Sequence, residues 1–183
     1  MTEHAEHFTK VADAFTQRAR AVPDDAWDNP APCEGWVARD VVRHMVEWMP
    51  SLFFDAWGIE GPALPSVDDD PARAWEALVD ALQHSLSDPE TAKREADIRP
   101  GRFSFEQAVD QLGSGDIVVH TWDLARATGL DETLDPQEVH NLLMAMEPID
   151  EMLRQSGQFG PRVIVPEDAD EQTKLIAFTG RRP

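Results

Sequence analysis

The stretch of sequence that decides the fold is Asp116-Ile117-Val118-Val119-His120-Thr121-Trp122-Asp123-Leu124-Ala125-Arg126-Ala127-Thr128-Gly129. It predicts the second half of a helix that stops at Gly129, because glycine favours the left-handed conformation beyond a helix end. Asp116 and His120 are four residues apart, so a helix places their side chains on one face, one above the other. A carboxylate oxygen and an imidazole nitrogen in that arrangement can bind one divalent metal ion. Two ligands do not make a site, so the prediction depends on a third.

Apolar residues recur at helical spacing on both sides of this stretch. Upstream, the spacing predicts helices over 3–22, from Trp36 to beyond Leu52, and over 71–87. The stretch itself belongs to a helix that begins at Ser104, where Gln107 completes a capping box. A fifth helix starts after Asp135 and runs to about residue 155. We therefore expect one all-α domain over residues 1–183: a bundle of four or five helices, long connections, and an extended C-terminal tail with a short helix over 171–178.

Prolines and glycines refine this expectation. Pro50 and Pro148 fall inside helical patterns and should kink or shorten those helices. Gly113 and Gly115 lie in the middle of the fourth helix, where each costs about 1 kcal/mol relative to alanine. We expect another helix to pack very closely there. The polar residues 88–102 are expected to form a loop.

The charge balance narrows the partners of the chain. Its 35 acidic residues outnumber 16 basic ones, for a formal charge of -19. Such a surface repels phosphate groups, so we expect neither nucleic acid nor an anionic membrane as a partner. No apolar run approaches the ~20 residues that span a bilayer, and the start of the chain is too acidic and polar for a signal peptide. With Cys33 as the one cysteine, no intrachain disulfide can form, and we expect a cytoplasmic protein.

His44 is the best third ligand among the six histidines. It lies on the apolar stripe of the second predicted helix, where an unpaired imidazole would cost free energy through desolvation. Two imidazoles and one carboxylate, with a position open to water, form the ligand set of many catalytic zinc sites. Zinc is the leading expectation, and nickel, iron and manganese suit the same ligands. The other histidines receive little weight: His4 and His7 are expected to be exposed at a helix start, and His84 and His140 to lie on polar faces.

Each candidate ligand also has a purely structural interpretation. His44 can be a core histidine bonded to a backbone carbonyl, Asp116 a solvated charge, and His120 a packed imidazole that donates to Asp123. Asp123 can support a metal ligand or act as a general base beside metal-bound water. Its alternative role is an ion pair with Arg126 or with an arginine from a loop. Cys33 can be a metal ligand, a nucleophile or a packed loop residue.

The residues near the proposed ligands outline a ligand pocket. Trp36, Trp48 and Trp122 are expected to line it, because they lie close in sequence to His44 and His120. A carboxylate substrate would be held by Arg43, Arg126 or a loop arginine, and the sequence does not choose among them.

Three segments carry a joint pattern: Pro32-Cys33-Glu34-Gly35-Trp36 with Val41-Val42-Arg43-His44, then Asp116-x-x-x-His120-x-Trp122-Asp123-Leu124-Ala125-x-Ala127-Thr128-Gly129, and last Leu175-Ile176-Ala177-Phe178-Thr179-Gly180-Arg181. Together they resemble the mycothiol-dependent maleylpyruvate isomerase metal-binding family, a part of the DinB-like superfamily. The resemblance implies a DinB-like four-helix bundle with His44, Asp116 and His120 around a divalent metal, usually zinc. Asp116 stands where the isomerase has glutamate. Mycothiol or a similar thiol is the cosubstrate that the family implies.

The leading functional hypothesis is a thiol-dependent transferase or isomerase. A bound metal would lower the pKa of a thiol or of water, and the partners would be a small-molecule thiol and an electrophile. The alternatives are a non-catalytic metal- or ligand-binding stress-response bundle and a metal-dependent hydrolase. The isomerase has an additional C-terminal domain for which this chain is too short, so we do not carry over isomerase activity itself. The superfamily's frequent dimers leave a homodimer open.

Overall fold

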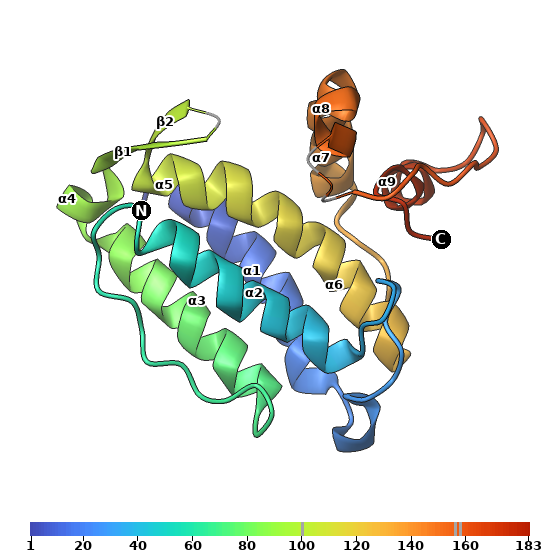
Figure 1. The fold of residues 1–183 in the computed structure, drawn as a ribbon, viewed down its shortest axis with the longest axis horizontal. Coiled ribbons are helices and arrows are strands. Elements are labelled where there is room, and N and C mark those ends of the chain that lie inside the picture. The colour runs from blue at the N-terminus through green and yellow to red at the C-terminus, as the bar shows by residue number, and fades with distance from the viewer. Residues whose placement is uncertain (100, 156, 158) are drawn as a thin grey trace.

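The fold is described from a computed structural model that covers residues 1–99, 101–155, 157 and 159–183. Figure 1 shows the long helical segments of the chain side by side. They are α1 (Glu3–Ala21), α2 (Ala38–Phe53), α3 (Pro71–Ser87) and a continuous segment of α5 (Phe105–Ala108), the π-helical turn η2 (Val109–Gly113) and α6 (Ser114–Thr128). The extensive contacts join α1 to α3, α3 to α2, α2 to α6 and α6 to α1. The chain is therefore an all-α, DinB-like four-helix bundle, as its sequence predicts.

The helix ends follow the predicted local signals. The Ser104 hydroxyl accepts from the Gln107 backbone N–H, and the Gln107 side chain accepts from the Ser104 N–H, so the capping box forms. The Asp70 carboxylate caps α3 ahead of Pro71. At the other end of α6, Gly129 adopts φ 70°, the left-handed conformation that glycine favours. These caps satisfy backbone groups that helix ends leave unpaired.

The core of the bundle is built around large aromatic side chains. Trp75 on α3 is fully buried, packs on Phe15 of α1 with ring centroids 4.6 Å apart, and donates its indole N–H to Thr16 Oγ1 over 2.8 Å. A tryptophan can be buried at little cost only when that N–H has a partner. The Thr16 hydroxyl in turn donates to the Ala12 carbonyl, so the tryptophan joins α3 to the backbone of α1.

Replacing Trp75 by phenylalanine should lower the free energy of unfolding by about 1–3 kcal/mol. The substitution leaves a cavity and removes the donor that pairs with Thr16. Urea unfolding of the metal-free protein measures the change. Trp36→Phe is the matched control, because Trp36 is only half-buried. An equal loss in both variants would contradict the role given to Trp75.

The two glycines of the fourth helical segment lie where neighbouring helices come close, as predicted. A β-carbon at Gly113 would lie 3.4 Å from the ring of Phe53 on α2. One at Gly115 would lie 3.0 Å from Leu142 Cδ1 on α7 (Pro136–Met146). The close approach comes from two different helices, and the first of these contacts falls at the π-helical turn η2.

Three expectations about the connections need correction. Residues 88–102 are not a plain loop: they contain α4 (Pro89–Ala92) and the start of an antiparallel hairpin of β1 (Glu95–Ile98) and β2 (Gly101–Ser104). The hairpin forms because Ala96, Ile98 and Phe103 pack against the core, while charged residues alternate with them. Pro50 does not shorten α2, which is one of the two effects expected of it, since the helix continues to Phe53. Pro148 does more than bend the fifth helix, which is interrupted by the 3₁₀ turn η3 (Glu147–Ile149) before α8 (Asp150–Gln155).

The C-terminal part lies beside the bundle. Helix α7 contacts α6, and α9 (Glu171–Phe178) packs against α7. The tail has no regular secondary structure from 159 to 166, as its sequence predicts. Leu175, Ile176, Ala177 and Phe178 are all buried, so the short helix α9 is anchored through one continuous run.

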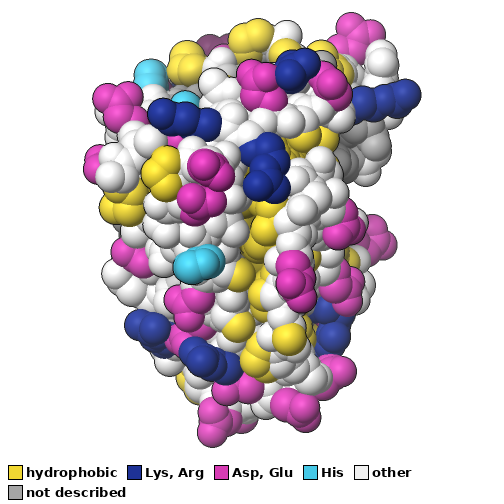
Figure 2. All heavy atoms as spheres, turned by 90° about the vertical axis from the view of Figure 1, so that its left-hand side faces the viewer, with side chains coloured by type: hydrophobic (Ala, Val, Ile, Leu, Met, Phe, Trp, Pro, Cys, Tyr) yellow, Lys and Arg dark blue, Asp and Glu magenta, His cyan; other side chains and the backbone are white. Residues whose placement is uncertain are grey.

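The distribution of surface charge and the lengths of the helices bear on which partners the protein can bind. On the face drawn in Figure 2, acidic side chains are spread over the surface and do not gather in one patch. On the face shown, the acidic groups that contribute to the formal charge of -19 therefore belong to solvated surface and not to one acidic site. Within the part of the chain that the structure describes, no helix combines the length and the apolar character needed to cross a membrane.

Candidate metal centre

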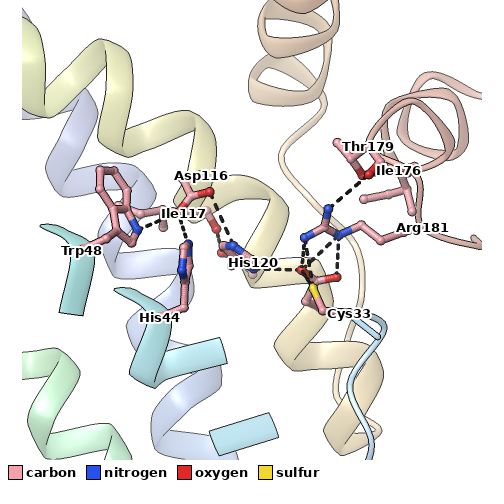
Figure 3. A network of polar contacts seen from close by, with 11 residues as sticks. Cys33, His44, Trp48, Asp116, Ile117, His120, Ile176, Thr179 and Arg181 are labelled. Carbon is pink, nitrogen blue, oxygen red and sulfur yellow. Dashed lines mark hydrogen bonds and ion pairs between the residues drawn. The ribbon is translucent and has the colours of Figure 1, made fainter. Parts of the chain in front are cut away.

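Helices α2 and α6 bring the three predicted ligands together (Figure 3). His44 Nε2 lies 3.2 Å from Asp116 Oδ2, and His120 Nε2 lies 3.4 Å from Asp116 Oδ1. The two imidazole rings are 4.9 Å apart between centroids. All three side chains offer a ligand atom within 4.8 Å of the other two. The i,i+4 pair on α6 thus meets a histidine 72 residues earlier in the chain.

The separations between these atoms suit a metal ion. Bonds from zinc to nitrogen and oxygen are about 2.0–2.2 Å, so tetrahedral angles separate two ligand atoms by about 3.3 Å. The separations of 3.2 and 3.4 Å are close to that value, and each runs to a different oxygen of Asp116. Because the carboxylate offers one oxygen to each imidazole, the short side chain of Asp116 still reaches both histidines.

The cluster is buried on one side and open on the other. The side chain of His120 is 5% exposed, whereas those of His44 and Asp116 are 33% and 30% exposed. A ligand could not reach a fully enclosed cluster, but His44 and Asp116 leave one edge of this cluster exposed to solvent. The arrangement therefore resembles the open site of a catalytic metal more than the closed site of a structural one.

Charge and hydrogen bonds hold the cluster in place. Burial disfavours the imidazolium of His120, but the charge of Asp116 and the hydrogen bonds to Asp116 and Asp123 outweigh it and raise the pKa of His120 to about 9. Burial likewise opposes ionisation of Asp116, yet the two histidines hold the pKa of its carboxyl well below the usual range. Asp116 is therefore ionised, and a carboxylate in that state can bind a cation.

Two tryptophans frame the cluster. Trp48 donates its indole N–H to Asp116 Oδ2 over 3.0 Å. The ring of Trp36 lies parallel to His120, with an interplanar angle of 15° and centroids 6.0 Å apart, and it is 5.3 Å from His44. Trp36 and Trp48 therefore lie beside the cluster, whereas Trp122 is a core residue with only 2% exposure.

Behind His120 lies the fully buried carboxylate of Asp123. His120 Nδ1 is 2.8 Å from Asp123 Oδ2. Arg181 donates to the same carboxylate through Nε at 2.9 Å and Nη2 at 2.7 Å. Two of the roles considered for Asp123 coexist here, support for a histidine and an ion pair, whereas its complete burial behind His120 gives no support to a role as general base beside metal-bound water. The arginine that pairs with Asp123 comes from the C-terminal tail and is not Arg126.

The structure offers a second group of potential ligands, formed by Cys33, His120 and Asp123. It is the weaker candidate. Burial and then the charge of Asp123 raise the pKa of the Cys33 thiol to about 12, so the thiolate that metals and electrophiles need is disfavoured. The guanidinium of Arg181 already lies 3.3 Å from Cys33 Sγ and contacts Asp123, and it would repel a metal cation there.

The other arginines with predicted roles are engaged elsewhere. Arg126 pairs with Glu132, with Nε 2.8 Å from Oε1, and lies 4.6 Å over the ring of Trp122. These contacts give no support to its expected place in the ligand pocket. Arg43 pairs with Asp68 over 2.6 Å. The sequence leaves the choice of arginine open; Arg181 lies in the third segment that carries the family resemblance, but that segment indicates no partner for it.

His4 and His7 are not the freely exposed histidines that we expected. Both are half-buried, because each directs Nδ1 at Asp110 on η2, and His7 Nε2 lies 2.7 Å from Glu138 of α7. Lys10 also contacts Glu138, over 2.8 Å. The hydrogen bond to Asp110 is the main reason why the pKa of His7 is raised to about 9. This cluster ties the first turns of α1 to two other elements.

The raised pKa of His7 predicts a pH-dependent contribution to stability. It is complete below pH 6.5, the ordinary pKa, and is lost as the pH rises through about 9. Solvent screening of this half-exposed group limits it to about 1 kcal/mol. Urea unfolding of His7→Gln should therefore show that deficit at about pH 6 and almost none near pH 10. A deficit that stays constant over this range would argue against the charged pair.

The fold and the cluster together define the class: a DinB-like helical bundle whose second and sixth helices carry a candidate His-Asp-His metal centre. The chain belongs to the family of the mycothiol maleylpyruvate isomerase N-terminal domain, whose model matches residues 8–125. Two proteins from Mycobacterium tuberculosis, strains CDC 1551 / Oshkosh and ATCC 25618 / H37Rv, each described as uncharacterized, are 29% identical to it over 175 residues, which cover 94% of both chains. No solved structure matches the chain significantly.

Proposed function

We propose that this protein is a metal-dependent enzyme that transfers a low-molecular-weight thiol of the mycothiol type to an electrophile. His44, Asp116 and His120 would hold the divalent metal, with zinc as the leading candidate. The observation that carries the proposal is the convergence of these three ligand atoms at a partly exposed edge of the bundle. The choice of a mycothiol-type thiol as the cosubstrate rests on the family to which the chain belongs.

The residues around the cluster have distinct tasks in this proposal. A metal bound there supplies a positive charge that lowers the pKa of a thiol to near neutrality. Trp48 fixes the Asp116 carboxylate by its hydrogen bond, and Asp123 fixes His120. Trp36 offers an apolar wall beside both imidazoles, against which part of a substrate can be desolvated.

The nucleophile has to come from outside the chain. Cys33 is the one cysteine, and its thiol is kept protonated by burial and by Asp123. A cosubstrate thiol can instead approach the exposed side of His44 and Asp116. In the reaction, the sulfur forms a bond to an electrophilic carbon, the leaving group departs with its electron pair, and the thiol proton passes to water.

The proposal is tested with untagged protein loaded with cobalt(II). Adding mycothiol should produce a thiolate-to-cobalt charge-transfer absorption. The zinc form should then accelerate the displacement of halide from an aryl halide by mycothiol, with loss of the free thiol. A protein that binds metal but shows neither signal would be a non-catalytic metal-binding bundle. Hydrolysis of an ester substrate without any thiol would favour the metal-dependent hydrolase.

A further inference from the structure

The segment that follows α9 reaches the buried carboxylate behind the candidate metal centre. The side chain of Arg181 is only 12% exposed, and its guanidinium contacts Asp123 and Cys33. Figure 3 shows it directed toward Cys33. The family model ends at residue 125, so nothing in that match accounts for this arginine. An arginine that is so little exposed needs partners for its charge, because an unpaired buried charge is costly.

The backbone that carries Arg181 is held from two sides. The buried run that ends α9 anchors it from one side, and the Arg181 backbone N–H donates to the Ile176 carbonyl. On the other side, Gly180 has φ 87°, and a β-carbon there would lie 3.1 Å from Gly160 Cα. The turn after α9 thus requires glycine, and it directs the next side chain inward.

A chain of charged hydrogen bonds links Arg181 to the candidate ligand His120. The guanidinium binds both oxygens of Asp123, through Nε to Oδ1 and Nη2 to Oδ2. Asp123 Oδ2 in turn lies 2.8 Å from His120 Nδ1. When His120 loses a proton to bind a metal, a carboxylate at that position favours retention of the proton on Nδ1, so that Nε2 presents its lone pair to the metal. Nε2 is the atom that faces Asp116.

We propose that Arg181 is a positioning residue for the metal centre, which acts through Asp123 on the orientation and tautomer of His120. The C-terminal tail thereby completes a site whose ligands come from α2 and α6. The inference rests on the proposed function in one respect, namely that His44, Asp116 and His120 bind metal.

The geometry distinguishes this role from that of an ordinary surface ion pair. Both partners are buried, and the planar guanidinium binds the carboxylate at two points, which fixes its plane as well as its position. Lysine at 181 would keep the charge but could not hold both oxygens in the same plane. Asp123 would then be free to rotate away from His120.

Zinc affinity of three variants tests the proposal, measured by competition with a chromogenic chelator. Arg181→Gln should weaken zinc binding by about 10–100-fold, the usual effect of losing a supporting residue. Arg181→Lys should weaken zinc binding by more than about threefold but by less than Arg181→Gln does, because lysine keeps the charge and loses the two-point contact. Arg182→Gln is the matched control, since it removes the same charge one residue later from an exposed side chain, and its affinity should be unchanged.

The cobalt(II) absorption spectrum adds a readout that general loosening of the tail would not move. The spectra of the Arg181 variants should differ from that of the parent protein, while Arg182→Gln should reproduce it. If Arg181→Gln does not fold, the zinc affinity of Arg181→Lys tests the inference. Unchanged zinc affinity in folded Arg181 variants would overturn the inference. A parent protein that binds no zinc would instead overturn the proposed function.

Discussion

Replacing His44 by alanine is expected to weaken zinc binding by more than about 100-fold and to abolish thiol transfer. Loss of a residue that merely supports a ligand costs about 10–100-fold, and His44 is one of the three proposed ligands itself. Its side chain is one-third exposed, so its removal should leave the metal-free bundle folded. The measurement is zinc content after dialysis, followed by titration against a chelator.

The control for this variant is His84→Ala. His84 lies exposed on α3 and is not part of either group of potential ligands among the described residues. It should bind zinc like the parent protein, and both variants should unfold at similar urea concentrations when metal-free. Stoichiometric zinc in His44→Ala protein would show that the ligand assignment is wrong.

Replacing Asp123 by alanine should lower the free energy of unfolding by about 3–5 kcal/mol, because one partner of a buried ion pair is lost while the other stays buried. Arg181 would keep its charge with no carboxylate beside it, and His120 would lose its partner at Nδ1. Zinc affinity should fall as well. Chemical unfolding of the metal-free protein separates the effect on stability from the effect on binding.

Two comparisons sharpen the test of Asp123. Asp123→Asn keeps the shape of the side chain and a partial set of hydrogen bonds, so its loss of stability should be smaller. Glu34→Ala removes an exposed acidic residue from the neighbouring loop and should change stability by less than about 0.5 kcal/mol. A loss of stability in Asp123→Ala as small as that of Glu34→Ala would contradict the buried network.

The four helices of the bundle could be predicted because their signals are local. Apolar spacing and caps such as Asp70-Pro71 and Ser104-Gln107 lie within the segments that they define. The hairpin of β1 and β2 could not be predicted in the same way, since alternation over four residues is too short to distinguish a strand from a polar loop. The candidate ligands on α2 and α6 could be chosen from the apolar stripe that carries His44 and from the i,i+4 spacing of Asp116 and His120.

The support behind the ligands could not be predicted from spacing. The sequence leaves the partner of Asp123 open between Arg126, three residues away, and an arginine from a loop; Arg126 pairs with Glu132. The true partner, Arg181, is 58 residues away in the chain. The position of Arg181 depends on how α9 packs, which cannot be predicted from a local sequence pattern. The raised pKa of the Cys33 thiol likewise depends on burial and on the charge of Asp123.

X-ray diffraction at the zinc absorption edge, from crystals of the untagged, zinc-loaded protein, tests directly whether His44, Asp116 and His120 bind one metal ion. If they do, an anomalous peak should lie about 2.0–2.2 Å from His44 Nε2, His120 Nε2 and an oxygen of Asp116. A peak beside Cys33 and Asp123, or crystals of zinc-treated protein without any peak between α2 and α6, would contradict this ligand assignment.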